Sequence, residues 1–435
     1  MHCAKLKIKA FEREGIPKFM LRGKLIMKEK LILSTILAGT LVLTGCANDS
    51  SQKGSEEDKH KNHASESKDK ENGKPYSDVA YPKDGVKGIY VSANSTNGEK
   101  FKELTKFIDE TDLNAMVIDV KDDTGNVTIN FNTGNKQIDD NTIDIVDAKP
   151  LLKQMESKNI YPIARIVTFK DSKLAEDHPE WSFREEDGSV WENDGGDKFV
   201  NPFNKNVWDY NIDISKEAAK AGFKDIQYDY VRFPEGFENV ESSLQYNKGA
   251  YKNSELSDVD QRVDTITQFL GTARKELKDY DVKVSADVFG YAAMVEEAPG
   301  IGQSFPKIAE NTDAISSMIY PSHWSPGDFG LDAPDKEPYK AIDQYLDKET
   351  SVLNALGKDK PKSRPWLQDF TAQYLGEGNY KAYDSQAIED QVRALKDHGV
   401  NEFLLWNAAN DYTTGVDYTP EADKEKLKEN KDKEK

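Results

Sequence analysis

The chain has 435 residues and a formal net charge of −19, with a pI near 4.9. So large an acidic excess argues against nucleic acid as a partner, since a phosphate backbone is bound by clustered lysine and arginine. The length allows one large domain with tails, or two domains. Cysteine occurs only at Cys3 and Cys46, and the six histidines lack metal-ligand spacing. We therefore expect no disulfide framework, no zinc site of the usual kind and no cofactor.

Residues 27–46, MKEKLILSTILAGTLVLTGC, have the form of a bacterial secretory signal. Two lysines precede an apolar run from Leu31 to Leu43 that is too short for a comfortable transmembrane helix. The ending LTGC resembles a lipobox, which implies that Cys46 is lipidated and begins the mature protein. This predicts a lipoprotein anchored at the extracytoplasmic face of the cell membrane. The competing interpretation is a plain membrane anchor or a buried helix. Residues 1–26 are interpreted as an extension before the true start.

Two charged segments flank the part of the chain that can bury a core. Residues 47–82 contain almost no apolar residue before Tyr76 and are expected to form a disordered tether. Residues 421–435, EADKEKLKENKDKEK, are expected to form a solvated, disordered tail. The folded domain is therefore predicted to span residues 83–420.

Within this domain short β-type runs alternate with amphipathic helical patterns. Eight strands are predicted, at residues 86–93, 115–121, 161–169, 225–233, 282–289, 314–320, 365–370 and 401–408. The helices between them are expected at 101–111, 148–159, 208–221, 263–280, 301–311, 339–356 and 385–398. This alternation predicts a single α/β domain, a (β/α)8 TIM barrel with a long loop after the third strand. An open doubly wound sheet would need a glycine-rich phosphate loop after its first strand, and the sequence has none.

Aspartates occur where the fourth and fifth predicted strands end. The segment DIQYDYVRFP places Asp229 at the end of one strand, and SADVFG places Asp287 at the end of the next. Alternation along the strands points both side chains into the barrel. TIM barrels build their active sites at this end of the strands. Because neighbouring strands lie about 4.8 Å apart, the two carboxyls could approach the roughly 5–5.5 Å separation found in retaining glycosidases.

Other strand ends are predicted to bring polar and aromatic side chains to the same mouth. The candidates for substrate binding are Asp119, Lys121, Arg165, Tyr230, Arg232, Tyr320, His323, Gln368 (or Asp369) and Trp406. For any single one of them, a satisfied ion pair inside the barrel is an equally good interpretation. Arg232 or Lys121 is expected to keep one catalytic aspartate ionised, while burial and the neighbouring charge keep the other protonated. The set as a whole predicts glycosidic bond hydrolysis by two carboxyl groups.

The segments VKGIYVSA, NAMVIDVKDDTGNV, YPIARIVTFKD, FVNPF and DYVRFP resemble a bacterial family of TIM-barrel domains that are named as glycoside hydrolases by similarity. This family is distantly related to α-galactosidase-like barrels, and the similarity covers about residues 83–418. It implies that Asp229 is the nucleophile. Related families carry the acid on the fifth or the sixth strand, and here the sixth ends in Tyr320-Pro321-Ser322-His323 without a carboxylate. The acid is therefore assigned to Asp287.

The resemblance implies an extracellular or cell-wall polysaccharide as substrate, with the membrane contacted only through the lipid anchor. The alternative function is a non-catalytic carbohydrate-binding lipoprotein, and a deacetylase is disfavoured because the sequence lacks its histidine-rich metal spacing. The long loop at residues 170–206 contains four large aromatic residues, Trp181, Phe183, Trp191 and Phe203. They are expected either to stack on sugar rings or to pack the loop against the barrel.

Overall fold

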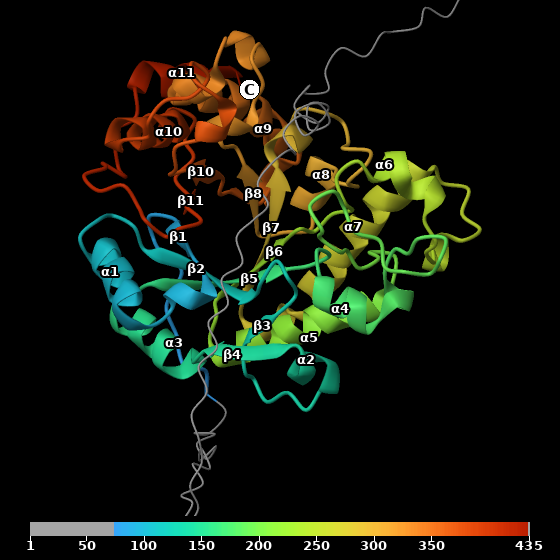
Figure 1. The fold of residues 1–435 in the computed structure, drawn as a ribbon. Helices are drawn as coiled ribbons and strands as arrows, with labels where there is room; N and C mark the ends of the chain where they lie inside the picture. Colours follow the sequence, from blue (N-terminus) through green and yellow to red (C-terminus); the bar gives the residue numbers. More distant parts are fainter. Residues whose placement is uncertain (1–73, 434–435) are drawn as a thin grey trace, which may run out of the picture. The chain divides into compact units, whose positions relative to one another are not determined.

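The structure is a computed structural model that describes residues 74–433 (Figure 1). The predicted signal segment, Cys46 and most of the predicted tether lie outside these residues. Within the described part, no helix combines the length and the apolar character needed to cross a bilayer.

Eight parallel strands form a closed barrel. They are β1 (Lys87–Val91), β2 (Ala115–Lys121), β5 (Tyr161–Val167), β6 (Asp225–Asp229), β7 (Lys283–Phe289), β8 (Ala314–Met318), β10 (Trp366–Gln368) and β11 (Phe403–Trp406). Each strand pairs with the next in this order, and β1 pairs with both β11 and β2, which closes the ring. The predicted α/β barrel and its eight strands are confirmed.

Helices surround the barrel (Figure 1). The main ones are α1 (Gly98–Asp109), α3 (Ala148–Ser157), α5 (Lys205–Ala221), α7 (Asp258–Glu276), α8 (Phe305–Ala309), α9 (Pro338–Ala355) and α10 (Ser385–Asp397). Side-chain caps fix several of their starts, because the first N–H groups of a helix have no partner within it. Ser257 accepts from the backbone N–H of Asp260 at the start of α7, and Asp384 accepts from that of Ala387 at the start of α10.

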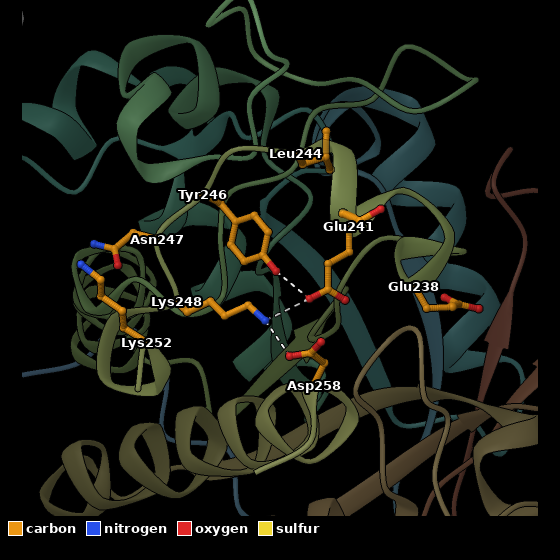
Figure 2. Close-up of a pocket in the computed structure, with 9 residues that line it drawn as sticks. Glu238, Glu241, Leu244, Tyr246, Asn247, Lys248, Lys252 and Asp258 are labelled. Carbon is orange, nitrogen blue, oxygen red and sulfur yellow. Dashed lines mark hydrogen bonds and ion pairs between the residues drawn. The ribbon is translucent and has the colours of Figure 1, made fainter. Parts of the chain in front are cut away.

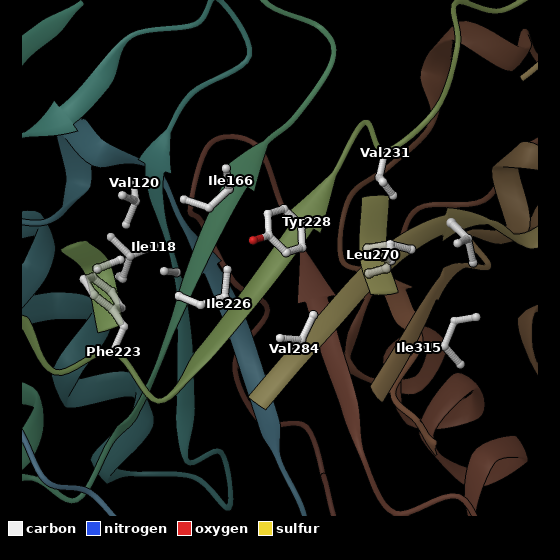
Figure 3. Packing of buried hydrophobic residues seen from close by; sticks show 14 of the residues in the cluster. Ile118, Val120, Ile166, Phe223, Ile226, Tyr228, Val231, Leu270, Val284 and Ile315 are labelled. Atoms are coloured by element: carbon white, nitrogen blue, oxygen red, sulfur yellow. The ribbon is translucent and has the colours of Figure 1, made fainter. Parts of the chain in front are cut away.

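Alternation along the strands separates two apolar cores. Outward-facing residues such as Ile226, Val284 and Ile315 pack against the helices (Figure 3). A second cluster, which includes Val117 and Trp366, lies inside the barrel. Burying both faces of every strand is what a parallel sheet requires, and it explains why these strands read as nearly continuous apolar runs.

Several short elements were not predicted from the sequence. After β2 the chain forms β3 (Val127–Ile129), α2 (Lys136–Asp140) and β4 (Thr142–Val146), and β3 pairs with β2 in antiparallel orientation. The other additions are α4 (Ser172–Asp177), α6 (Phe237–Val240) and β9 (Lys362–Ser363).

Two boundary predictions are corrected. The end of the predicted tether packs on the barrel, where Val79 joins the interior cluster and the hydroxyl of Tyr81 donates to Glu402 at 2.7 Å. The predicted disordered tail contains α11 (Lys424–Lys433). Asn430 Nδ2 donates to the carbonyl of Asp397 at 3.0 Å, next to the C-terminus of α10. Tertiary contacts therefore stabilise a helix that its charged composition did not indicate.

Candidate active site

One arginine binds two aspartates at the mouth of the barrel. Arg165 of β5 donates from Nη1 to Asp119 Oδ1 at 2.6 Å. It also donates from Nε and Nη2 to Asp229 Oδ2 at 2.9 and 2.6 Å. All three side chains are buried. Burial opposes the positive charge, but the carboxylates of Asp229 and Asp119 raise the pKa of Arg165 well above its ordinary value. The ion pair stabilises a carboxylate at Asp229 where an unpaired one would be costly.

Aromatic side chains hold this cluster in place. The hydroxyl of Tyr90 donates to Asp119 Oδ2 at 2.6 Å, and its ring stacks on Trp406 with 4.3 Å between centroids. The guanidinium of Arg165 lies 5.7 Å from the centre of each of these rings. Burial raises the pKa of Asp119, and the contacts with Arg165 and Tyr90 oppose that rise. Trp406 is half-buried and is the last residue of β11.

Asp287 lies in a different environment from Asp229. Register pairs Tyr228 with Ala286, so the two aspartates that follow them are level on neighbouring strands. Asp287 Oδ1 accepts a hydrogen bond from the indole N–H of Trp366 at 2.8 Å. Burial, together with the charge of Asp229, raises the pKa of Asp287 well above its ordinary value. Asp229 is therefore paired with a cation, whereas the surroundings of Asp287 favour its protonated form.

Tyr320 and His323 stand beside this pair, on the segment that follows β8. Tyr320 is buried, and after burial itself the charges of Asp287 and Asp229 are the largest causes that raise its pKa. Its ring contacts the ring of His323 edge to face at 4.8 Å. His323 is exposed as a whole residue, although desolvation by the surrounding protein lowers the pKa of its imidazole to about 4.

Tyr230 and Arg232 form another side of the mouth. Tyr230 has a left-handed backbone conformation, with φ 47°, and its N–H donates to Asp229 Oδ1 at 2.6 Å. The centre of its ring lies 5.1 Å from Lys170 Nζ and 4.8 Å from the guanidinium carbon of Arg232. Arg232 also pairs with Glu235 at 2.9 Å. Among the described residues no ion pair joins Arg232 to either aspartate, so the expectation that it keeps one ionised is wrong. The ion pair of Asp229 is with Arg165.

Lys121 does not reach the mouth, which corrects the prediction that it binds substrate. The pairing of β2 with β5 shifts register between Asp119 and Lys121. Lys121 is fully buried, pairs with Asp171 at 2.7 Å and donates to the carbonyl of Val167 at 2.6 Å. It anchors the loop after β5.

Gln368 is also fully buried and connects two loops instead of facing the mouth. Its Oε1 accepts from the backbone N–H of Ser322 at 3.1 Å, and its Nε2 donates to Asp335 Oδ1 at 2.9 Å. Asp369, the other candidate at this strand end, accepts from the hydroxyl of Thr413 at 2.6 Å. Both side chains fix the loops that border the site.

The aromatics of the long loop are buried to different degrees. Phe183 and Phe203 are buried among other rings, with Phe183 4.6 Å from Phe237 and Phe203 5.1 Å from Phe233. Trp181 and Trp191 are half-buried. Packing therefore accounts for the two phenylalanines.

A surface hollow of about 760 Å³ lies over the segment between β6 and α7, and its lining includes none of the aspartates above. Figure 2 shows that Lys248 pairs with two carboxylates of this lining. Lys248 binds Asp258 at 2.6 Å and Glu241 at 3.2 Å, and the hydroxyl of Tyr246 donates to Glu241 at 2.7 Å. No group of three or more His, Cys, Asp or Glu side chains within residues 74–433 is placed to hold a metal ion.

The family described as "Putative glycosyl hydrolase domain" matches residues 88–412. The chain belongs to this family. The match spans the barrel from β1 to β11 and includes all the residues of the acid cluster. A search of curated proteins finds no match.

Several solved structures align with this chain. β-Galactosidase from the psychrophilic Marinomonas ef1 aligns with a TM-score of 0.50 and 13% identity, over 79% of this chain and 58% of that chain. The glycoside hydrolase domain of PgaB (BpsB) from Bordetella bronchiseptica aligns with a TM-score of 0.49 and 13% identity, over 75% and 94%. A hypothetical protein from Ruminiclostridium thermocellum is 30% identical, with a TM-score of 0.40, over 46% and 97%.

Proposed function

We propose that this protein hydrolyses O-glycosidic bonds in an extracellular or cell-wall polysaccharide, with Asp229 and Asp287 as the two catalytic carboxyls. The observation that carries the proposal is the contrast between them. Arg165 donates two N–H groups to Asp229, whereas the raised pKa of Asp287 favours its protonated form. Glycoside hydrolysis needs this combination of an anion and an acid. Membership of the family supports the assignment.

In the first step Asp287 gives its proton to the glycosidic oxygen as the bond to the anomeric carbon breaks. Asp229 attacks that carbon, and Asp287, now a carboxylate, removes a proton from the water that releases the sugar. The two residues are level on adjacent strands, whose spacing of about 4.8 Å favours this retaining course. Arg165 and the N–H of Tyr230 fix Asp229. Tyr320 and Trp406 would border the sugar.

Substitution of each aspartate tests the two roles. Reducing ends released from a panel of cell-wall polysaccharides are measured for the wild type, Asp229→Asn and Asp287→Asn. Both variants should lose at least about a thousandfold in kcat. With an aryl glycoside whose leaving group needs no proton, Asp287→Asn should form product again when azide is added. Asp213→Asn on α5 is the matched control and should retain activity. Unchanged turnover in Asp229→Asn would remove the proposed nucleophile.

A second candidate function is carbohydrate binding without catalysis. The observation in its favour is burial, because Asp229 is 6% exposed and Asp287 2% exposed. A glycan could then bind the rim without reaching either carboxyl. Two results together would favour this function over hydrolysis. The wild type would form no product, and glycan binding would survive the double substitution of Asp229 and Asp287 by Asn.

We also propose that Cys46 carries a lipid that holds the protein at the extracytoplasmic face of the membrane. The proposal is supported by the sequence LTGC after a short apolar run. Cys46→Ala should move the protein from the membrane fraction to the soluble fraction and lower its mass by that of the lipid. Unchanged fractionation of Cys46→Ala would contradict it.

A further inference from the structure

Tyr374 is the one exposed Phe, Tyr or Trp in residues 74–433, with 62% of its surface accessible. It lies in the loop between β10 and α10, within a 3-10 turn at Gln373–Leu375. Scattered exposed apolar residues are normal on a protein surface, so exposure alone assigns no role to this ring.

The hydroxyl of Tyr374 is nevertheless tethered. It donates to the side chain of Ser322 at 3.0 Å, and Ser322 is itself buried. The N–H of Ser322 is in turn held by Gln368, which is bound to Asp335. The ring is therefore held by its hydroxyl end while much of its surface faces solvent. A ring fixed before binding loses less conformational entropy when a ligand stacks on it.

Other rings lie between the acid-bearing strand β7 and the segments that follow β8 and β10, one of which carries Tyr374. Tyr320 follows β8, the strand beside the one that carries Asp287, and burial together with the charge of Asp287 raises its pKa. It contacts His323 edge to face at 4.8 Å and Phe370 at 5.9 Å. His323 is the neighbour of Ser322, and Phe370 is half-buried. We call the three rings that lie outward of Tyr320 the aromatic rim: His323, Phe370 and Tyr374.

Strand order gives the side of the acid pair on which this rim lies. The sheet runs β6, β7, β8, β10, so the segments after β8 and β10 stand on the Asp287 side of the pair and away from Asp229. If Asp287 protonates the leaving oxygen, the rim borders the sugar that leaves.

We propose that the aromatic rim, with Tyr374 as its main contact, stacks on the face of the pyranose ring on the leaving-group side of the cleaved bond. The inference rests on the proposed function. It assigns to the site a glycan chain of at least two residues, because a glycoside with a small aglycone would leave the rim unoccupied. The C–H face of a pyranose is apolar, and an exposed aromatic ring offers it a surface of matching size. Gln368 acts as a positioning residue for this surface.

Kinetics on two substrates test the inference. Tyr374→Ala should raise KM about tenfold for a polysaccharide that the wild type cleaves, the loss expected for one aromatic contact, with kcat little changed. An aryl monoglycoside should show no change. Tyr374→Phe keeps the ring and loses only the tether, so KM should rise about two- to threefold. Leu256→Ala, another exposed apolar residue, is the control and should match the wild type on both substrates. An unchanged KM for the polysaccharide in Tyr374→Ala would overturn the inference while leaving hydrolysis intact.

Binding measurements separate this inference from the proposed catalysis. Calorimetric titration of the wild type with maltotetraose, cellotetraose and N-acetylchitotetraose should identify at least one ligand whose affinity falls about tenfold in Tyr374→Ala. Such a fall without any hydrolysis by the wild type would support the stacking surface and contradict catalysis. If none of the three probes binds to the wild type, the stacking surface is wrong.

Discussion

Oδ2 of Asp229 accepts two N–H groups from Arg165, at 2.9 and 2.6 Å, while the remaining arm of the guanidinium binds Asp119 at 2.6 Å. Asp119 therefore fixes the plane of the guanidinium, and Tyr90 fixes Asp119 through a hydrogen bond of 2.6 Å. This chain of contacts makes Asp119 and Tyr90 positioning residues for Asp229.

Removing Arg165 should show how strongly Arg165 and the two aspartates are coupled in their effect on the free energy of unfolding. Arg165→Met leaves two buried carboxylates without a partner, and we expect it to lower the free energy of unfolding by about 3–5 kcal/mol. Adding Asp119→Asn removes one of the orphaned charges, so the double variant should be more stable than the sum of the single effects predicts. Urea denaturation of the wild type, the two single variants and the double variant measures the coupling energy. Strictly additive losses would show that the two residues do not share one network.

The pH profile of activity should follow the protonation of Asp287. A general acid works only while it is protonated, so activity is present below its pKa and is lost as the pH rises through it. Because the pKa of Asp287 is raised well above its ordinary value, the loss should fall at a much higher pH than a free aspartate would give. The measurement is kcat/KM from about pH 4 to pH 9 on a substrate that needs protonation and on an activated aryl glycoside. Only the first substrate should show the alkaline loss. Equal alkaline losses on both would assign the acid to another group.

The barrel and the place of its acids could be predicted because both follow from periodicity. Eight alternations of strand and helix leave few folds to choose from, and alternation along β6 and β7 points Asp229 and Asp287 to the same interior. The partners of these acids were harder to find. Tyr90 and Trp366 occupy inward-facing positions, but an aromatic residue inside a strand is also what an ordinary apolar core contains.

Three errors have identifiable physical causes. Strict alternation places Lys121 on the same face as Asp119, but the register shift between them turns the lysine toward Asp171. Gln368 lies on the face of its strand that alternation predicts, but loops distant in sequence enclose its side chain. No local sequence pattern indicates that these loops contact it. Helix α11 was missed for the same reason, because its anchors on α10 are tertiary contacts.

The buried pair of Lys121 and Asp171 predicts a stability effect without a catalytic one. Lys121→Met leaves Asp171 fully buried and unpaired, so we expect a loss of about 3–5 kcal/mol in the free energy of unfolding. KM should stay at the wild-type value, because the side chain is buried against Asp171 and does not reach the mouth of the barrel. Lys153→Met, at an exposed position on α3, is the control and should change stability by less than about 0.5 kcal/mol. A raised KM in folded Lys121→Met would contradict this prediction and support a role for Lys121 in substrate binding.

Asp369 should make stability fall as the pH rises, the reverse of a salt-bridged aspartate. Burial raises the pKa of Asp369 to about 6, although Thr413 donates to it. The folded protein therefore holds a proton that the unfolded chain, with a pKa near 3.8, has already released. The stabilisation by protonated Asp369 is fully present below the pKa of the unfolded chain and is lost as the pH rises to about 6. It amounts to up to about 3 kcal/mol, since one pKa unit corresponds to about 1.4 kcal/mol. Asp369→Asn cannot titrate, so its stability relative to the wild type should rise between about pH 4 and pH 7 in thermal unfolding. Parallel curves for the two proteins would show that Asp369 is ionised in the fold throughout this range.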